Sequence, residues 1–254
     1  LQISQAIVTV TPEGNAVFKL ESAGTAGQFT RGVKQNIQVM PEALLNTMLV
    51  GQSLNIQSSV NGTIEGDIAV GQMVNGDGTW TVTGEVTEKT DIPTPNFDFD
   101  EAKNDADFII NAKMTFTEAD SPYVGRYYVT KAVDIESNVE VTGGIVCESS
   151  VTIDGVTNPM IETANKYPAI ACQGKLDIKN SSGVNITGII YTGGNFQMQG
   201  TSNCVIRTIL IVDGVATIQS STNDTFEYYS EFDPTNYFDE ITIIPFDNWE
   251  EYAI

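Results

Sequence analysis

AIACQGKLDIKNSSGVNITG (169–188), IIYTGGNFQMQGTSNCVIRT (189–208) and ILIVDGVATIQSS (209–221) are consecutive stretches that repeat one pattern every twenty residues. Two sets of residues keep step in this repeat: Gly174, Gly194 and Gly214, and then Ile178, Met198 and Ile218. The first two stretches each hold two short runs in which apolar and polar residues alternate, separated by glycine, asparagine and serine; the third, as quoted, holds one such run. This period, with strand alternation and turn residues, is typical of a stacked parallel β-helix (β-solenoid), in which each repeat forms one coil.

The same pattern extends outward from these three repeats. It fits residues 127–143 and 143–155, and much earlier residues 50–66 and 67–84. About seven coils are therefore predicted, with one interruption between about Glu85 and Arg126. Neighbouring coils pair as parallel strands about 4.8 Å apart, so seven coils form a rod roughly 30 Å long.

Alternation within each repeat predicts which side chains face the inside of the rod. Leu176, Phe196 and Ala216 form one inward column, and Ile178, Met198 and Ile218 form the next. Side chains between them point outward because successive residues of a strand alternate between its two sides. Asp177, Gln197 and Thr217 are thus expected on the outer surface.

The first 44 residues differ from the coils. Residues 6–11, 16–22 and 29–39 alternate strictly and are joined by turn-forming segments, which predicts a small antiparallel hairpin sheet packed on the solenoid. Residues 41–47 are expected to form one helical turn that leads into the first coil. Residues 239–246 read as a strand that pairs with this sheet.

The interruption is predicted to hold a short helix from about Asp98 to Ile109, within an insertion at about residues 91–112. Asp98, Asp100 and Glu101 lie in its first turn, where the helix dipole favours negative charge. Its apolar positions, which are Phe97, Phe99, Ala102, Ala106 and Ile109 or Ile110, are expected to cover an apolar flank of the solenoid. The β-helix itself is assigned to residues 45–225.

Residues 226–254 are rich in aromatic side chains, and we interpret them as a carboxy-terminal cap that closes an end or a side of the solenoid. A carbohydrate-binding platform is the alternative. The aromatic residues concerned are Tyr228, Tyr229, Phe232, Tyr237, Phe238, Phe246 and Trp249.

The charge of the chain limits its partners. The formal net charge is −21, with 12 basic and 33 acidic residues. Such a surface repels nucleic acid and anionic membranes, so neither is expected as a partner. The acidity is typical of solubility in a salty or extracellular medium, and acidic loops that gather calcium are the alternative. The segment NGDGT (75–79) resembles the start of a calcium loop but lacks the later glutamate, so no metal ligand is assigned.

Three cysteines occur, at Cys147, Cys172 and Cys204, and none forms a C-x-x-C pair. Cys147 and Cys172 hold equivalent positions in coils expected to be adjacent, about 5 Å apart between Cα atoms, which a disulfide can span. Two small buried hydrophobes stacked in the core are the other interpretation. Cys204 aligns with Val184 at an inward position and is expected to be a buried free thiol.

The residues offer little catalytic chemistry. The absence of histidine excludes Ser-His-Asp and Cys-His catalysis and metal sites built on imidazole. Polysaccharide cleavage by a β-helix needs carboxylates at close range. Asp134 and Asp177 share an outward column but are two coils, or about 10 Å, apart. Asp154 and Asp213 lie at turns without a predicted partner, and the cations Lys175, Lys179 and Arg207 are isolated. We therefore assign no catalytic, cofactor-binding or metal-ligating residue.

The order of segments resembles a known family. A hairpin that ends in a strand with Thr30, Arg31 and Val33 precedes the coils, which break at P-x-F-D-F-D-E (95–101) and resume at Y-Y-V (127–129). The chain then runs through G-I-I-Y-T-G-G-N-F (188–196) and closes on an aromatic tail with Trp249. This order is similar to the β-helical ectodomains of type IV pilin-like proteins, the minor-pilin or pilus-assembly group of prokaryotic cell surfaces. The resemblance implies an amino-terminal hydrophobic helix before Leu1, cleaved or left out, as the link to a membrane or filament.

Two functions follow as expectations. The first is a non-enzymatic structural or adhesion protein, extracellular or at the cell surface, whose partners are other pilin-type subunits or surface glycans. The second is an extracellular glycan-binding or glycan-cleaving β-helix protein.

Overall fold

The computed structural model of the chain describes residues 5–14, 17–26, 29–40, 42–57, 61–76, 78–89, 93–163, 167–230, 237–238, 242–245 and 250–253. It is all-β, with parallel sheets that form a solenoid of about nine turns, and the described residues include one α-helix, α1 (Phe99–Asn104). Two short 3-10 helices also occur, η1 (Glu42–Leu45) and η2 (Glu118–Asp120). The predicted β-solenoid is confirmed, with about nine turns instead of seven.

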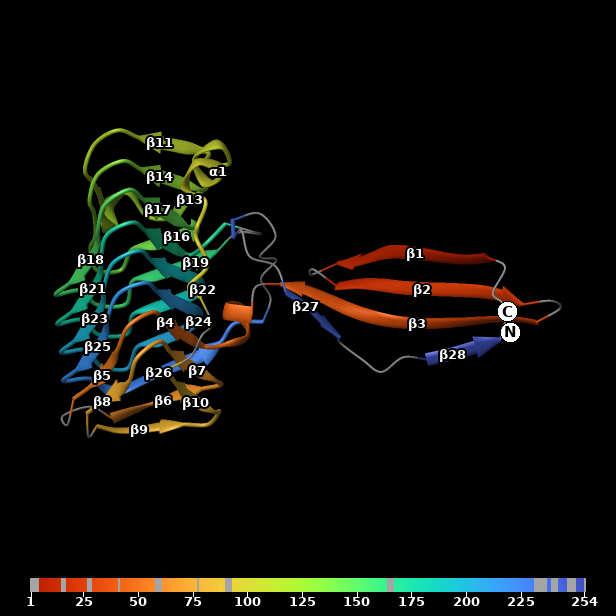
Figure 1. Cartoon of the computed structure of the whole chain (residues 1–254). Coiled ribbons are helices and arrows are strands. Elements are labelled where there is room, and N and C mark those ends of the chain that lie inside the picture. The colour runs from red at the N-terminus through yellow and green to blue at the C-terminus, as the bar shows by residue number, and fades with distance from the viewer. Residues whose placement is uncertain are drawn as a thin grey trace.

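The solenoid has three faces, and most turns give one strand to each of them (Figure 1). The first face consists, in stacking order, of β11 (Phe108–Ile110), β14 (Tyr127–Val129), β17 (Ile145–Cys147), β20 (Ile170–Cys172), β22 (Asn185–Thr192), β24 (Val205–Val212), β4 (Met48–Val50), β7 (Ile68–Val70) and β10 (Val86–Glu88).

The second face is a separate parallel sheet. Its strands are β12 (Met114–Phe116), β15 (Val133–Ile135), β18 (Val151–Asp154), β21 (Leu176–Lys179), β23 (Phe196–Gln199), β25 (Ala216–Gln219), β5 (Leu54–Ile56) and β8 (Val74–Asn75). The third face contains the amino-terminal halves of β22 and β24, together with β13 (Tyr123–Val124), β16 (Glu140–Gly143), β19 (Met160–Thr163), β26 (Thr222–Tyr228), β6 (Asn61–Glu65) and β9 (Thr79–Val82).

The interior of the solenoid is built as the repeat predicts. Leu176 pairs in register with Phe196, which pairs with Ala216, and all three side chains are buried. The next inward column, Ile178, Met198 and Ile218, is fully buried as well. These columns belong to one apolar cluster that fills the coil, which we call the inner core. Burial of each large aliphatic side chain stabilises the fold by about 1.5–3 kcal/mol, so the stacked columns need no helix to hold them.

The glycine column is also confirmed. The amide of Gly194 donates to the carbonyl of Gly174 over 2.9 Å, and the amide of Gly214 donates to the carbonyl of Gly194 over 3.0 Å. A Cβ placed on Gly194 would lie 2.8 Å from the carbonyl oxygen of Gly174, and one placed on Gly214 would lie 2.8 Å from that of Gly194. Glycine recurs here because two backbones approach too closely for a side chain.

The coils are not stacked in chain order. β4 pairs with β24, β5 with β25 and β6 with β26, so the coils of residues 48–88 continue the stack beyond the coil of residues 209–228. At the other end of the stack lies β11, which follows these coils in the sequence but is remote from them in space (Figure 1). The paired strands cover edges that would otherwise be open. The chain therefore links the two ends of the solenoid through residues 89–107.

That linking segment contains α1, which is shorter than expected. Asp98 caps it, because its Oδ1 accepts a hydrogen bond from the amide of Glu101 over 2.9 Å. The helix ends at Asn104 and not near Ile109, because residues 108–110 pair with β14 as a strand. Ile110 thus packs against the inner core, while Ile109 is 48% exposed. The insertion between coils is correspondingly shorter, since β10 and β11 to β13 add turns that the repeat does not predict.

A second apolar cluster covers the outside of the first face, and we call it the outer core. It joins outward residues of the face, such as Tyr191 and Ile211, to Leu44 of η1, to Phe97 just before α1 and to Ala102 of α1. Tyr229, Tyr237 and Phe238 from the aromatic tail complete it. The expected role of the helix, covering an apolar flank, is confirmed, and these tail residues lie against a side of the solenoid. Phe232, Phe246 and Trp249 lie outside the described residues.

The amino-terminal strands form an antiparallel sheet. β1 (Gln5–Gly14), β2 (Val17–Ala26) and β3 (Phe29–Met40) are neighbours, and β27 (Thr242–Pro245) and β28 (Glu250–Ala253) both pair with β3 on its other edge. The predicted hairpins are confirmed, and so is the predicted pairing of the late strand over residues 242–245; residues 239–241 and 246 lie outside the described residues. In Figure 1 this sheet extends away from the side of the solenoid, so the expectation that it packs on the solenoid is wrong.

Candidate functional site: the outer faces of the solenoid

The three faces differ in what they offer to a ligand. On the first face the outward side chains of Tyr128, Val146 and Ala171 are at most 1% exposed, because the outer core covers them. The second and third faces carry outward columns of polar side chains, most of them exposed or half-buried, although Asp177 of the second face is buried. A ligand of the solenoid is therefore expected on these two faces.

Tyrosine hydroxyls fasten the cover to the first face. Tyr128 donates to Glu148 over 2.8 Å, Tyr191 to Asp213 over 3.1 Å and Tyr237 to Asp105 over 2.6 Å. Burial raises the pKa of all three phenols, and the neighbouring carboxylates add to this. Asp213 thus has a partner that the sequence pattern does not reveal. These groups hold the fold together and are not free for catalysis.

The second face carries one outward column through all eight strands. In stacking order it runs Thr115, Asp134, Thr152, Asp177, Gln197, Thr217, Asn55 and Asn75. Asp134 and Asp177 share this column with Thr152 between them, as the repeat predicts.

Lysines bind both of these aspartates. Lys113 lies 2.5 Å from the carboxylate of Asp134. Lys175 and Lys179 lie 2.5 Å and 3.1 Å from Asp177, whose side chain is only 6% exposed. The expectation that these two lysines are isolated is wrong, because both flank one carboxylate at outward positions of the same strand region. Arg207 is likewise paired, with Glu227 at 2.8 Å on the third face.

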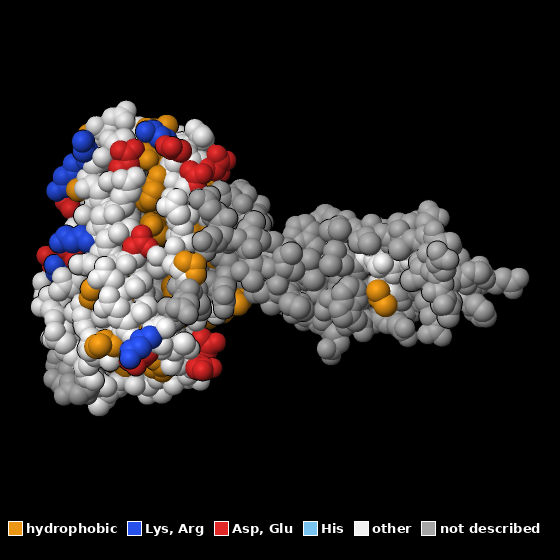
Figure 2. Space-filling model, viewed as in Figure 1, with side chains coloured by type: hydrophobic (Ala, Val, Ile, Leu, Met, Phe, Trp, Pro, Cys, Tyr) orange, Lys and Arg blue, Asp and Glu red, His pale blue; other side chains and the backbone are white. Residues whose placement is uncertain are grey.

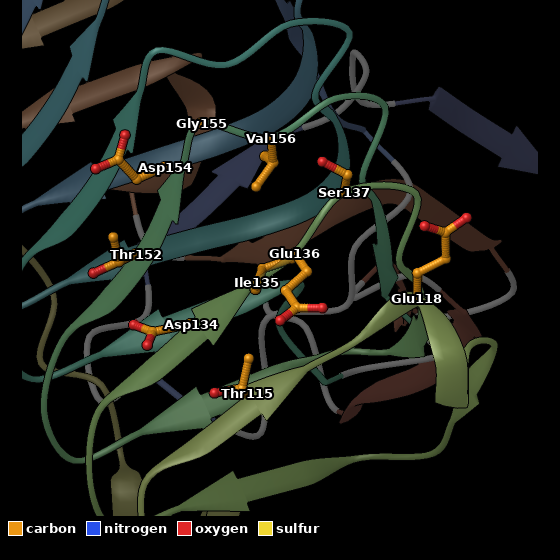
Figure 3. Close-up of a pocket in the computed structure, with 10 residues that line it drawn as sticks. All are labelled: Thr115, Glu118, Asp134, Ile135, Glu136, Ser137, Thr152, Asp154, Gly155 and Val156. Atoms are coloured by element: carbon orange, nitrogen blue, oxygen red, sulfur yellow. The ribbon is translucent and has the colours of Figure 1, made fainter.

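A groove of about 710 Å³ opens beside the upper part of the second face. Four carboxylates line it, from Glu118, Asp134, Glu136 and Asp154. Figure 3 shows that they do not converge: Asp154 and Glu118 lie on opposite sides of the groove, with Ile135 and Val156 between them. Three adjacent coils bring these four carboxylates to one groove, although Asp154 is the only one besides Asp134 that lies on a strand.

Two of the four have polar partners already. Asp134 is paired with Lys113, and Asp154 accepts a hydrogen bond from Nδ2 of Asn180 over 3.0 Å. Among the described residues, no three histidine, cysteine, aspartate or glutamate side chains lie close enough to hold a metal ion. A spacing in the sequence could have revealed this groove. Asp134 and Thr152 are 18 residues apart, as are Glu136 and Asp154, and this spacing places them at equivalent positions of neighbouring coils.

The third face has a smaller hollow of about 280 Å³, lined by Thr187, Arg207, Tyr228, Tyr229 and Ser230. Its two most reactive groups are engaged. Arg207 pairs with Glu227, and the hydroxyl of Tyr228 donates to the carbonyl of Leu44 over 2.9 Å. The hollow marks the junction between a coil and the aromatic tail.

One corner of the solenoid holds a buried network of polar side chains. Asp224 is 1% exposed, and its carboxylate accepts hydrogen bonds from Thr201 Oγ1 over 2.7 Å and from the amide of Cys204 over 2.8 Å. Thr201 and Ser221 hydroxyls lie 2.8 Å apart at the same corner of successive coils. This network links the same corner of successive coils.

The cysteines are buried free thiols. Cys147 and Cys172 pair in register on β17 and β20, so the predicted adjacency is confirmed, and they are stacked without a disulfide. Burial raises the pKa of Cys172 and Cys204 to about 12, which keeps both thiols protonated and unreactive at neutral pH.

No described helix is long and apolar enough to span a membrane. No family model matches the chain, and no curated protein matches it. Among solved structures, the chain is similar to an ice-binding protein from the Antarctic ascomycete Antarctomyces psychrotrophicus. That match has a TM-score of 0.40 and 14% identity, over 73% of this chain and 96% of that one. It is also similar to the competence-associated pilin ComZ from Thermus thermophilus, with a TM-score of 0.39 and 9% identity, over 97% of this chain and 83% of that one.

Proposed function

We propose that the protein is a non-enzymatic structural or adhesion subunit of a prokaryotic cell surface or pilus. In this proposal the antiparallel sheet is the attachment module, and the solenoid is a rigid body displayed by it. Its partners are other pilin-type subunits, reached through the sheet.

One topological observation carries this proposal. The whole solenoid is inserted between β3 and β27, which are neighbouring strands of the antiparallel sheet. β3 leads into the solenoid at Met40, whose backbone pairs with Thr242 of β27. Because both connections to the solenoid start from adjacent, hydrogen-bonded strands, the sheet can hold the solenoid in a fixed position.

The ends of the sheet support the same direction of display. Gln5 of β1 pairs with Thr25, and Ala253 of β28 pairs with Arg31. β1 therefore begins, and β28 ends, at the end of the sheet that is remote from Met40. Figure 1 shows this end of the sheet pointing away from the solenoid. A membrane or filament contact near these strand ends leaves the solenoid projecting outward.

The chemistry of the faces supports a non-enzymatic role. The chain has no histidine, and the groove carboxylates that flank Ile135 and Val156 point from opposite sides. Asp134 and Asp177 each form an ion pair with lysine, which favours a structural role for both carboxylates. The acidic surface also disfavours anionic polymers as partners.

Immunogold labelling of intact source cells with antibodies against the solenoid tests the location. Label on the cell surface or along filaments is expected, and label confined to the cytoplasm of opened cells contradicts the proposal. Cross-linking on intact cells should then join the protein to pilin-type subunits through peptides of β1 to β3.

A polysaccharide panel tests the absence of catalysis, with reducing ends and the ultraviolet absorbance of unsaturated products as readouts. No turnover is expected. Turnover that survives repurification and disappears in Asp134→Asn or Asp177→Asn would replace the proposal with the glycan-cleaving alternative.

A further inference from the structure

The outward side chains on the lower part of the second face carry no charge. Its outward residues on β23, β25, β5 and β8 form two columns, which we call the amide face: Gln197, Thr217, Asn55 and Asn75 in one, and Gln199, Gln219 and Gln57 in the other. The residues just before these strands, Asn195, Val215, Ser53 and Met73, are uncharged too. Every residue of the amide face is exposed or half-buried.

The absence of charge is local. In the same two columns, the coils directly above carry Asp134, Asp177, Glu136, Asp154 and Lys179. Charged side chains therefore fit these positions of the fold. On the left edge of the solenoid in Figure 2, blue and red side chains lie beside the upper and middle coils and white ones lie below them. In a chain with 33 acidic residues, a polar face without any charge on four consecutive strands is an unusual surface.

The geometry of the amide face is periodic. Parallel pairing in register repeats each column at the strand spacing of about 4.8 Å. Nε2 of Gln197 donates to Oε1 of Gln199 over 3.1 Å, and Nδ2 of Asn75 donates to Oδ1 of Asn55 over 3.0 Å. These bonds orient the amides but use only part of their capacity, because each amide has two donor hydrogens and an oxygen that accepts twice.

We propose that the amide face binds an extended, neutral, hydroxyl-rich polysaccharide chain. Sugar hydroxyls both donate and accept hydrogen bonds, as carboxamides do, so the two surfaces complement each other without a charge on either. A polymer with a regular repeat meets a regular ladder, and many weak contacts add up along its length. An anionic polymer is disfavoured because the rest of the surface is strongly negative.

This inference rests on the adhesion role proposed above and names the ligand class and the surface that serve it. A flat face without a deep pocket suits an insoluble polymer surface, whereas a short free sugar would gain too few contacts to bind tightly. The face lies on the solenoid and not on the antiparallel sheet, so a bound glycan leaves the proposed attachment module free.

The test is co-sedimentation of the purified full chain with cellulose and chitin particles, alongside a soluble array of neutral and uronate-containing glycans. The variant Gln197→Glu/Asn55→Asp/Gln219→Glu changes three amides to carboxylates of nearly equal size. The fold should tolerate it, because Asp134 and Asp177 stand in one of these columns and Asp154 in the other. Asn185→Asp is the matched control, since it makes the same change at an exposed position of the third face.

The wild-type chain and Asn185→Asp are expected to bind at least one neutral polymer, and the triple variant should lose about tenfold or more in affinity. Equal binding by the triple variant, stronger binding to uronate polymers, or no binding to any neutral polymer overturns the proposal. Inhibition of ice recrystallisation that the triple variant loses, without glycan binding, assigns the face to ice instead and also overturns it. These assays use soluble protein, so their failure leaves the immunogold result for the surface role unaffected.

Discussion

The inner core and the outer core of the first face are built on opposite principles. The inner core repeats: the same two inward positions recur in each coil, filled by Leu176, Phe196 and Ala216 and then by Ile178, Met198 and Ile218. The outer core collects single residues from separate segments, among them Leu44, Phe97, Tyr167 and Tyr237. A core built from repeated positions produces a period in the sequence, whereas a core assembled from single residues of separate segments produces no such period.

The two cores also do different work. The inner core makes the rod, and any coil contributes to it in the same way. The outer core decides which face of the rod is closed, because it covers only the first one. The second and third faces stay open because the described residues of the linking segment and the tail that join the outer core pack on the first face. Function on the outer faces therefore depends on a cluster that the repeat does not encode.

A charge placed in the inner core is expected to have the largest effect on stability. Ile178→Asp places an unpaired carboxylate in a fully buried column, and we expect a loss of more than about 4 kcal/mol or no soluble fold. Thermal melting measures it. Gln199→Asp, at an outward position of the neighbouring strand β23, should cost less than about 0.5 kcal/mol. Equal melting temperatures for the two variants would refute the inward assignment.

Removal of one ring from the outer core should have a smaller and more local effect. Phe97 stacks on Tyr191 with ring centroids 5.3 Å apart and on Tyr237 at 5.7 Å. Phe97→Ala is expected to cost about 3 kcal/mol by leaving a cavity. Hydrogen exchange should show faster opening of α1 while β21 to β25 stay protected. Phe108→Ala removes a ring that is 45% exposed and serves as the control with a smaller cost. Uniform loss of protection over the whole solenoid would show that the two cores are one cooperative unit.

The join between early and late coils tests the discontinuous stack. A Cβ on Gly51 would lie 2.6 Å from the backbone oxygen of Asp213, so Gly51→Ala should destabilise the protein by about 2 kcal/mol. Gln52→Ala changes an exposed neighbour and should be nearly neutral. Chemical denaturation of both variants measures the difference.

Paired cysteines examine the same join without an energy measurement. Asn55 and Thr217 are direct neighbours on β5 and β25, within the Cα separation that a disulfide spans. Asn55→Cys/Thr217→Cys should oxidise to a cross-link that mass spectrometry finds between their two peptides. A stack in chain order would keep these residues apart and give no such peptide.

Alkaline pH should act weakly on both cores. Burial raises the pKa of Cys172 and Cys204 in the inner core to about 12, and it raises the pKa of Tyr128 and Tyr191 in the outer core. Unfolded thiols and phenols titrate near 8.5 and 10, so their contribution is complete below about pH 8. It falls as the pH rises toward the folded values, because only the unfolded chain then releases protons.

Melting temperatures should therefore decline from about pH 8 to about pH 10.5. Cys172→Ala and Tyr128→Phe should each flatten that decline, and their relative effect separates the inner from the outer core. A melting temperature that rises over this range would contradict the burial of these groups.

Much of the fold could be predicted from the sequence, because most strands of the solenoid pair with strands that carry the same residue pattern. The register from Gly174 to Gly214, the inward columns, the adjacency of Cys147 and Cys172 and the hairpins of the first 44 residues are all local or periodic signals. The helix was placed at its correct cap, Asp98, but ran too long. Its last residues become β11 because pairing with β14 outweighs local helical preference.

The candidate site was read only in part. The outward positions Asp134, Asp177, Gln197 and Thr217 follow from alternation, and the structure places them in one column. Their partners do not follow from it. Lys113 reaches Asp134 from a coil that the repeat did not predict, and Glu118 joins the groove from the loop after that same coil.

The sequence by itself determined the coil and its inner core, because a side chain's direction in a strand depends only on its position in the chain. The tertiary structure alone decided the order of the coils. A parallel edge accepts any strand of matching direction and spacing, so the repeat does not specify that β4 follows β24. It also decided that Asn55 and Asn75 lie beside Gln197 and Thr217, and so completed the amide face from two distant parts of the chain.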